Sequence, residues 1–249
     1  MLLVSLLALA LQAGAAVPAR TTPEEQLVQA RAVQAAIIGS RGEAKRARQE
    51  EAVQAWRAVR KHHPRARAAI AEAAFRRGEL LRAMEEPGAS RGAFQEALEF
   101  APADSAWRVR ALLELGHLAR REGEWEKALV AYRRARETRG ADRRHRNTAR
   151  EWITKVQLKR DAWGAAEAAA RDWRQHAASL VEEVRAEDRR LEALIGQRRL
   201  IQARHELEGL RERMAEHARR PTDEAEAIAT ALDDMRAPTL LRRARRNGR

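Results

Sequence analysis

A short pattern of side chains recurs along the chain about every 38 residues. In each copy, a small residue is followed four positions later by a bulky or apolar one, and three positions after that by another apolar one. Spacings of four and three place all three side chains on one face of an α-helix. The copies are Ala52, Trp56 and Val59; Ser90, Phe94 and Ala97; Ala128, Tyr132 and Ala135; Ala166, Ala170 and Trp173; and Ala203, Leu207 and Leu210. A repeat of this length predicts stacked helix pairs that share one continuous core.

The composition agrees with an all-α fold. Alanine, leucine, arginine and glutamate, all good helix formers, dominate the chain, whereas β-branched residues are sparse. Only 4% of the residues are aromatic, which is poor for a single thick core. We therefore predict an all-α fold, a right-handed α-solenoid of stacked antiparallel helix pairs.

Several helix boundaries are marked in the sequence. Thr22-Pro23-Glu24-Glu25 combines an N-cap threonine, a proline at the first helical position and a glutamate three residues after the cap. Asp104 and Asp142 stand where the N-caps of later helices are expected. Pro87-Gly88 marks a turn between two paired helices.

The central copy of the pattern resembles the tetratricopeptide repeat (TPR) family. The resemblance is carried by Leu115, Gly116, Gly123, Ala128, Tyr132 and Ala135 in that copy, by Gly78, Phe94, Ala97 and Pro102 in the copy before, and by Ala52, Trp56 and Pro64 in the first. The small residue lets two helices cross closely, and the aromatic side chain fills the gap beside it. TPR units repeat about every 34 residues, so the extra residues here, for example Ser105 to Arg108, are expected to lengthen the first helix of each pair. A related helical solenoid with longer helices is the alternative, because Thr154 replaces the crossing glycine in the next unit.

The pattern divides the chain into eight segments. They are a signal peptide (1–16), an atypical first pair (22–64), a TPR-like unit (65–104), the best-matching unit (105–142), a degenerate unit (143–177), a helical hairpin or weak last unit (178–217), a short acidic capping helix (218–236) and a basic tail (237–249).

The first sixteen residues predict export. An apolar run from Leu2 to Leu11 is followed by small residues, which fits cleavage by a signal peptidase after Ala15 or Ala16. The run is too short to span a membrane, which needs about 20 residues. The expected location is therefore periplasmic or secreted. Retention of this segment as an uncleaved anchor, with membrane association, is the alternative.

The net charge is +13, and most of the positive charge is arginine. Two clusters stand out: a basic patch of Arg139, Arg143, Arg144, Arg146 and Arg150, and a basic tail of Arg242, Arg243, Arg245, Arg246 and Arg249. Such clusters can contact phosphates or lipid headgroups. They can equally reflect genomic codon bias and solvated helix surfaces, because acidic residues are interleaved almost everywhere. Nucleic acid is disfavoured as a partner by the predicted export.

No residue pattern indicates catalysis, a cofactor or a metal site. The chain has no cysteine, which excludes disulfides and thiolate chemistry. His62-His63 stand at a helix end, and His205-Glu206 lacks the second histidine of a zinc-protease helix. Paired carboxylates such as Glu50-Glu51 are sequence neighbours that point apart on a helix. We predict that the protein is not an enzyme.

The TPR resemblance implies that the first helix of each pair lines a groove that holds a protein or peptide. The corresponding residues are Phe75, Arg76, Glu79, Arg82, Arg110, Leu113, His117, Arg120, Glu151, Lys155 and Lys159. The lysine and asparagine pattern that clamps chaperone C-termini is missing, since Phe75 and Leu113 stand where lysine is expected. In the predicted groove, arginines steer an acidic segment of the partner and these two side chains add apolar contact.

The sequence thus predicts an exported scaffold in a cell-envelope or secreted assembly. One alternative is an anion-binding protein that uses the arginine clusters on nucleic acid or anionic lipid. The other is an accessory subunit of an enzyme complex.

Overall fold

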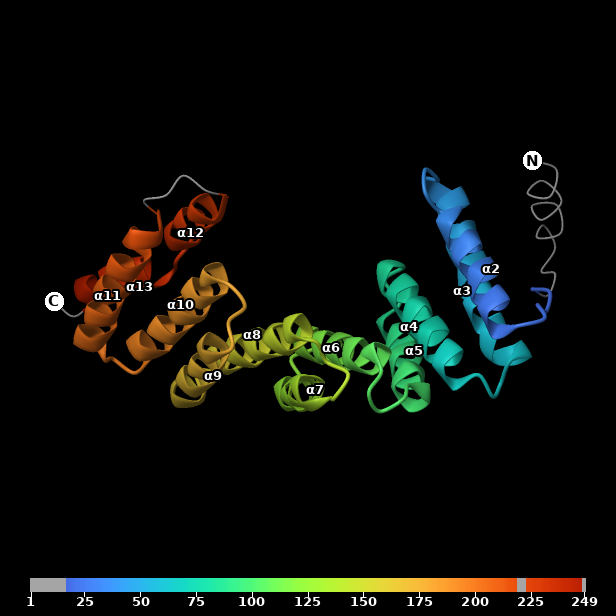
Figure 1. Ribbon diagram of the computed structural model, residues 1–249, viewed down its shortest axis with the longest axis horizontal. Coiled ribbons are helices and arrows are strands. Elements are labelled where there is room, and N and C mark those ends of the chain that lie inside the picture. The colour runs from blue at the N-terminus through green and yellow to red at the C-terminus, as the bar shows by residue number, and fades with distance from the viewer. Residues whose placement is uncertain (1–16, 219–222, 248–249) are drawn as a thin grey trace. The chain divides into compact units, whose positions relative to one another are not determined.

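The computed structural model describes residues 17–218 and 223–247, so the predicted signal peptide lies outside the described residues. The helices (Figure 1) fall into two compact units, Met1–Leu118 and Ala119–Arg249, and the boundary lies inside α6. In chain order they are α2 (Pro23–Ala35), α3 (Gly42–His62), α4 (Arg67–Ala83), α5 (Pro87–Phe100), α6 (Ala106–Arg121), α7 (Trp125–Glu137), α8 (Arg143–Lys159), α9 (Trp163–Gln175), α10 (Leu180–Gly196), α11 (Leu200–Ala218), α12 (Asp223–Asp233) and α13 (Ala237–Asn247). No strand occurs in the described ranges, which confirms the all-α prediction. None of the described helices is long and apolar enough to cross a membrane.

The predicted helix caps are confirmed at two of three places. At the start of α2, Thr22 Oγ1 accepts the backbone N–H of Glu25 (3.2 Å), and the Glu25 carboxylate accepts that of Thr22 (3.3 Å). Asp142 caps α8 by accepting a backbone N–H of its first turn (2.8 Å). The prediction that Asp104 caps α6 is wrong. Ser105 lies directly before α6, and its Oγ accepts the backbone N–H of Trp107 (3.2 Å).

The recurring pattern builds the core of both units. All fifteen of its residues are buried, and none is more than 5% exposed. Gly78 shows why the residue at the helix crossing must be small, since a Cβ there would lie 2.6 Å from Cε1 of Phe94. The first helices α4, α6, α8 and α10 have 17, 16, 17 and 17 residues, whereas the second helices α5, α7 and α9 have 14, 13 and 13. In the pairs α4–α5, α6–α7 and α8–α9 the first helix is therefore the longer one, as predicted. In α2–α3 and α10–α11 the second helix is longer, with 21 residues against 13 and 19 against 17.

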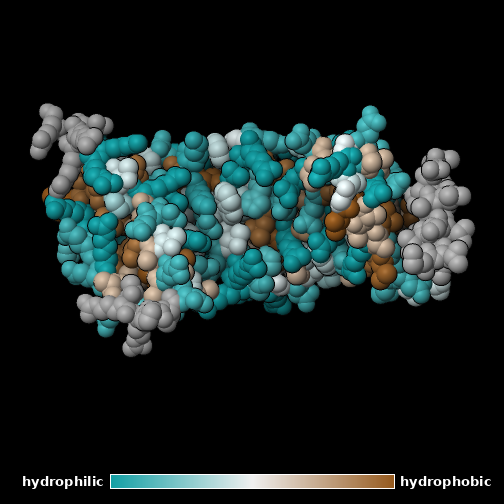
Figure 2. All heavy atoms as spheres, turned by 90° about the horizontal axis from the view of Figure 1, so that it is seen from above, coloured by the Kyte–Doolittle hydropathy of each residue, from teal (hydrophilic) through white to brown (hydrophobic). Residues whose placement is uncertain are grey.

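Consecutive helices pack on each other within each unit: α2 on α3, α3 on α4 and α4 on α5 in the first, and α7 through α11 in the same way in the second. Residues 178–217 form the helical hairpin α10–α11. Gly196 ends α10 instead of lying in the turn, and a Cβ there would overlap the indole ring of Trp163. Hydrophilic side chains cover most of the face drawn in Figure 2, with hydrophobic ones visible between them.

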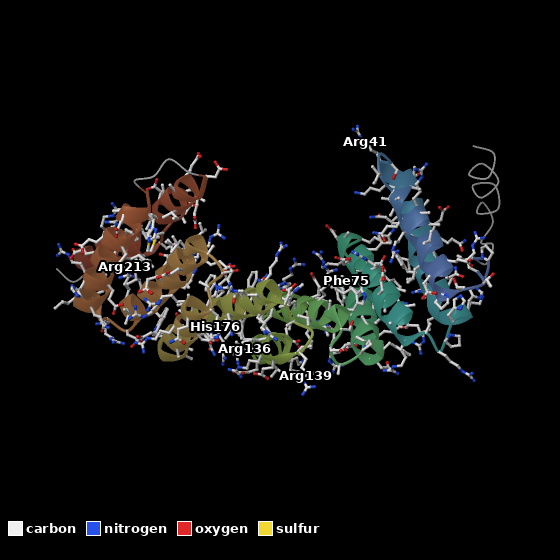
Figure 3. The ribbon with its side chains drawn as sticks, viewed as in Figure 1. Arg41, Phe75, Arg136, Arg139, His176 and Arg213 are labelled. Carbon is white, nitrogen blue, oxygen red and sulfur yellow. The ribbon has the colours of Figure 1, made fainter. Side chains whose placement is uncertain are left out.

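Acidic side chains on two second helices bind arginines from the two helices before them. Glu96 of α5 contacts Arg60 of α3 (2.7 Å) and Arg77 of α4 (2.5 Å). Burial opposes ionisation of Glu96, but the two guanidinium groups outweigh it and lower its pKa. Asp172 of α9 contacts Arg136 of α7 (3.2 Å) and Arg150 of α8 (3.1 Å), with His176 beside it (Figure 3). Part of the arginine content therefore ties helices together.

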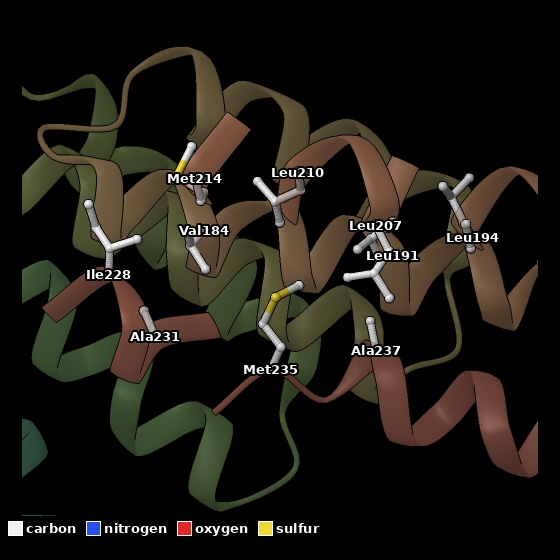
Figure 4. Close-up of a cluster of buried hydrophobic side chains, with 11 residues drawn as sticks. Val184, Leu191, Leu194, Leu207, Leu210, Met214, Ile228, Ala231, Met235 and Ala237 are labelled. Atoms are coloured by element: carbon white, nitrogen blue, oxygen red, sulfur yellow. The ribbon is translucent and has the colours of Figure 1, made fainter. Parts of the chain in front are cut away.

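The C-terminal segment forms a helix, so the expectation of a basic tail over residues 237–249 is wrong up to Asn247. The side chain of Asp188 in α10 is buried and accepts the backbone N–H groups of Arg236 (2.8 Å) and Ala237 (2.9 Å), which caps the start of α13. Ala237 is fully buried in a cluster formed by α10, α11 and α12 (Figure 4). Leu241 packs against the same cluster. Desolvation raises the pKa of Asp188, although the two backbone hydrogen bonds act to lower it.

Candidate partner-binding surface

Ion pairs link the first helices of the first unit. Arg31 of α2 contacts Glu72 of α4 (2.5 Å), and Arg82 of α4 contacts Glu114 of α6 (3.4 Å). These contacts link α2 to α4 and α4 to α6, which are first helices of their pairs. They also neutralise part of the charge that was expected to face a partner.

A cluster of three side chains, here called the Trp107 cluster, lies between α4 and α6. Trp107 is half-buried in the first turn of α6, and its ring is flanked by the guanidinium groups of Arg76 (5.2 Å from the ring centroid) and Arg110 (5.0 Å). Such cation–π contacts are worth about 0.5–1 kcal/mol at exposed sites, so they favour these positions of both arginines. Arg76 also pairs with Glu79 (3.0 Å). Arg110 has no carboxylate partner in the described part of the chain, so its charge is uncompensated.

Phe75 and Leu113 were expected to offer apolar contact to a partner, and that expectation is wrong. They are only 3% and 7% exposed. The ring of Phe75 lies 5.5 Å from that of Phe94 and 5.4 Å from that of Trp107. It therefore lies on the flank of α4 that packs against α5 and α6, and not on the free face of the helix.

A similar cluster, the Trp152 cluster, lies in the second unit. The ring of Trp152 in α8 is flanked by the guanidinium group of Arg120 in α6 (4.5 Å) and the ammonium group of Lys155 (4.6 Å), and it stacks on Tyr132 (6.2 Å, 17°). Lys155 pairs with Glu151 (2.5 Å). Arg120 makes no ion pair within the described residues, and its buried Nε lacks a hydrogen-bond acceptor there.

The two clusters share one construction. In each, a tryptophan of a first helix lies between a cation from the preceding first helix and a cation three residues later on its own helix. The residues predicted to line the groove include the arginines and Lys155 but not Trp107 and Trp152. The only available signal was the spacing of three, which places each tryptophan and the following cation on one helix face.

The other predicted groove residues contribute less. His117 is half-buried on α6, and Lys159 is exposed at the end of α8. No group of His, Asp or Glu within residues 17–218 and 223–247 could hold a metal ion.

The five arginines of the predicted basic patch have different surroundings in the structure. Arg150 binds Asp172, and Arg143 donates a hydrogen bond to the carbonyl oxygen of Ala177 (2.5 Å). Arg139 and Arg144 are exposed, and Arg146 is half-buried; none of the three has an ion pair among the described residues. In the predicted tail, Arg242 and Arg243 are exposed on α13, whereas the side chains of Arg245 and Arg246, and all of Arg249, lie outside the described part.

A buried ionic network in the second unit was not predicted from the sequence. Arg190 of α10 is 7% exposed and binds Glu187 (2.5 Å), which is 1% exposed, and Glu206 of α11 (2.6 Å). The hydrogen bond from Arg190 lowers the pKa of Glu206, although burial opposes the shift. This network joins α10 to α11 through groups that are buried or half-buried, so we assign it to stability.

No protein-family model matches the chain, and no curated protein matches it in sequence. Several solved structures do match in fold. A structure of nearly identical TPR-like repeats, assigned to a kinesin light chain of Podosopora anserina, has a TM-score of 0.59 at 10% identity and covers 81% of this chain and 100% of its own. BtubC (BKLC) from P. vanneervenii has a TM-score of 0.54 at 12% identity and covers 92% and 94%. The chain has a TPR-like fold. The TPR-like solenoid predicted from the sequence is thereby confirmed.

Proposed function

We propose that the protein is an exported, non-enzymatic TPR-like scaffold that captures an acidic segment of a partner protein on the first helices of its repeats. The assembly it serves would lie in the cell envelope or outside the cell. The main support is Arg110, a cation fixed on a tryptophan ring and without a carboxylate partner among the described residues. Arg120 offers the same arrangement in the second unit.

A cation held in this way suits recognition of a carboxylate. The guanidinium group is oriented before binding, so little side-chain entropy is lost when a partner arrives. It can form a charge-assisted, two-pronged hydrogen bond without first breaking an internal ion pair. Arg76 and Lys155 would supply weaker attraction, because each already contacts a glutamate on its own helix.

A pull-down tests this function. The bait is the full chain with a C-terminal tag, recovered from an exporting host and mixed with an envelope extract at low salt and at about 0.3 M salt, where exposed charge contacts are largely screened. We expect one or two proteins to be retained at both salt concentrations and lost from the Arg110→Glu variant. Arg57→Glu is the matched control, since Arg57 is exposed on α3, outside the predicted surface. Retention of nucleic acid or lipid alone, only at low salt, would favour the anion-binding alternative.

A further inference from the structure

A hollow of about 460 Å³ lies on the second unit between α11 and α13, away from the Trp152 cluster. Its size falls within the range of about 300–1,000 Å³ that ligand sites occupy. The floor is apolar and comes from Leu200, Ile201 and Leu207 of α11 and from Leu241 of α13. The contributing residues of α11 follow helical spacing, so one continuous face of that helix borders the hollow.

The exposure of this floor is unusual for the molecule. Among the described residues, the exposed large hydrophobic side chains are Val28, Ile38, Val130 and Ile201, and Ile201 is the most exposed at 89%. Ile201 is also the one of these four that borders the hollow. Leu200 and Leu241, both half-buried, border the same hollow, so burying this apolar surface against a partner would be favourable.

The rim of the hollow is positively charged. Arg204, Arg211 and Arg242 border it against a single carboxylate, Glu208, which pairs with Arg204 (3.0 Å). Arg211 and Arg242 have no carboxylate partner in the described ranges; Arg242 only donates a hydrogen bond to Thr239 Oγ1 (3.3 Å). Two uncompensated guanidinium groups therefore stand beside an apolar floor.

We propose that this hollow is a second docking site, which takes an acidic amphipathic helix of a partner protein. Apolar side chains of the helix would fill the floor, and carboxylates on its edges would pair with Arg211 and Arg242. Helix-in-groove recognition works in this way, through anchors spaced three and four residues apart. The concave shape favours a helix over a lipid bilayer, because a flat membrane would reach Ile201, the most exposed part of the floor, but not Leu207, which is only 5% exposed.

Fluorescence anisotropy with a labelled synthetic peptide tests the proposal. The peptide is an amphipathic helix of about 16 residues, with leucines spaced three and four apart and glutamates elsewhere, titrated with the full chain recovered from an exporting host. The test variant is Arg211→Glu with Arg242→Glu. The matched control is Arg185→Glu with Arg213→Glu, which makes the same charge change at exposed positions outside the lining of the hollow. Ile201→Ser tests the floor, and circular dichroism verifies that every variant keeps its helices.

The expected result is saturable binding to the wild type, a Kd about tenfold weaker in the test variant, and less than a threefold change in the control. Ile201→Ser should weaken binding about fivefold. Equal weakening by both charge variants, or no binding of the peptide by the wild type, would overturn the proposal. Vesicles of equal parts phosphatidylcholine and phosphatidylglycerol provide a further test. The proposal would be overturned if these vesicles bind the wild type but not the test variant, while the test variant still binds the peptide.

Discussion

Replacing Gly78 by alanine should destabilise the first unit, although alanine is the better helix former. The added Cβ would lie 2.6 Å, 2.7 Å and 2.9 Å from three ring carbons of Phe94. Ordinary carbon contacts lie at about 3.5–4.0 Å, so the ring would have to retreat by roughly 1 Å. Phe94 is fully buried and packs against Phe75, which leaves it no free space.

The expected magnitude follows from two opposing effects. Overpacking a core costs about 1–3 kcal/mol, and alanine regains about 1 kcal/mol of helix propensity. We expect Gly78→Ala to lower the free energy of unfolding by up to about 2 kcal/mol. Gly92→Ala is the control, because nothing lies within 4 Å of a Cβ at that position of α5; it should stabilise by about 0.5–1 kcal/mol.

Urea denaturation followed by circular dichroism measures both effects. Phe94→Leu shortens the side chain that the new Cβ would strike, so the double variant Gly78→Ala with Phe94→Leu should be more stable than the sum of the two single changes predicts. If Gly78→Ala proves as stable as Gly92→Ala, or if the double variant is strictly additive, the close α4–α5 crossing is not what requires glycine.

Three further predictions concern single features. Thr22→Ala removes the capping box of α2 and should cost about 1 kcal/mol in urea denaturation, whereas Thr21→Ala, which removes no side-chain cap, should cost little. The lowered pKa of Glu206 contributes stability that is present above the ordinary glutamate value of about 4.3 and is lost as the pH falls through the folded-state value. Glu206→Gln should therefore flatten the acid side of the stability curve; an unchanged slope would contradict that assignment. Intact mass of protein exported by a bacterial host should show loss of the first 15 or 16 residues, and a full-length mass would favour the anchor alternative.

The sequence allowed the helix pairs to be predicted because their determinants are local and repeated. The fifteen pattern residues and the Thr22 cap could each be found from spacing alone. The ion pair between Arg60 and Glu96 could also have been predicted, because Arg136 and Asp172 form the equivalent ion pair two periods later along the chain.

The features that were missed depend on contacts between distant segments. The anchor of α13 is Asp188, 48 residues before Arg236, so the sequence around α13 gave no sign of a capped helix. The sequence predicted correctly that Phe75 lies on the first helix of its pair. Whether its side of α4 is buried depends on how α4 packs against α5 and α6. The Trp107 cluster likewise joins α4 to α6, and only one of its two cations is a sequence neighbour of the tryptophan.

Site-specific photo-crosslinking tests the central claim, that the first helices form the binding surface. A photoreactive phenylalanine analogue would replace Glu79, half-buried beside Arg76 on α4, or Gln95, exposed on the second helix α5. After illumination in the exporting host, we expect a covalent adduct with a partner protein from position 79 and none from position 95. An adduct from position 95 alone, or equal adducts from both, would contradict it.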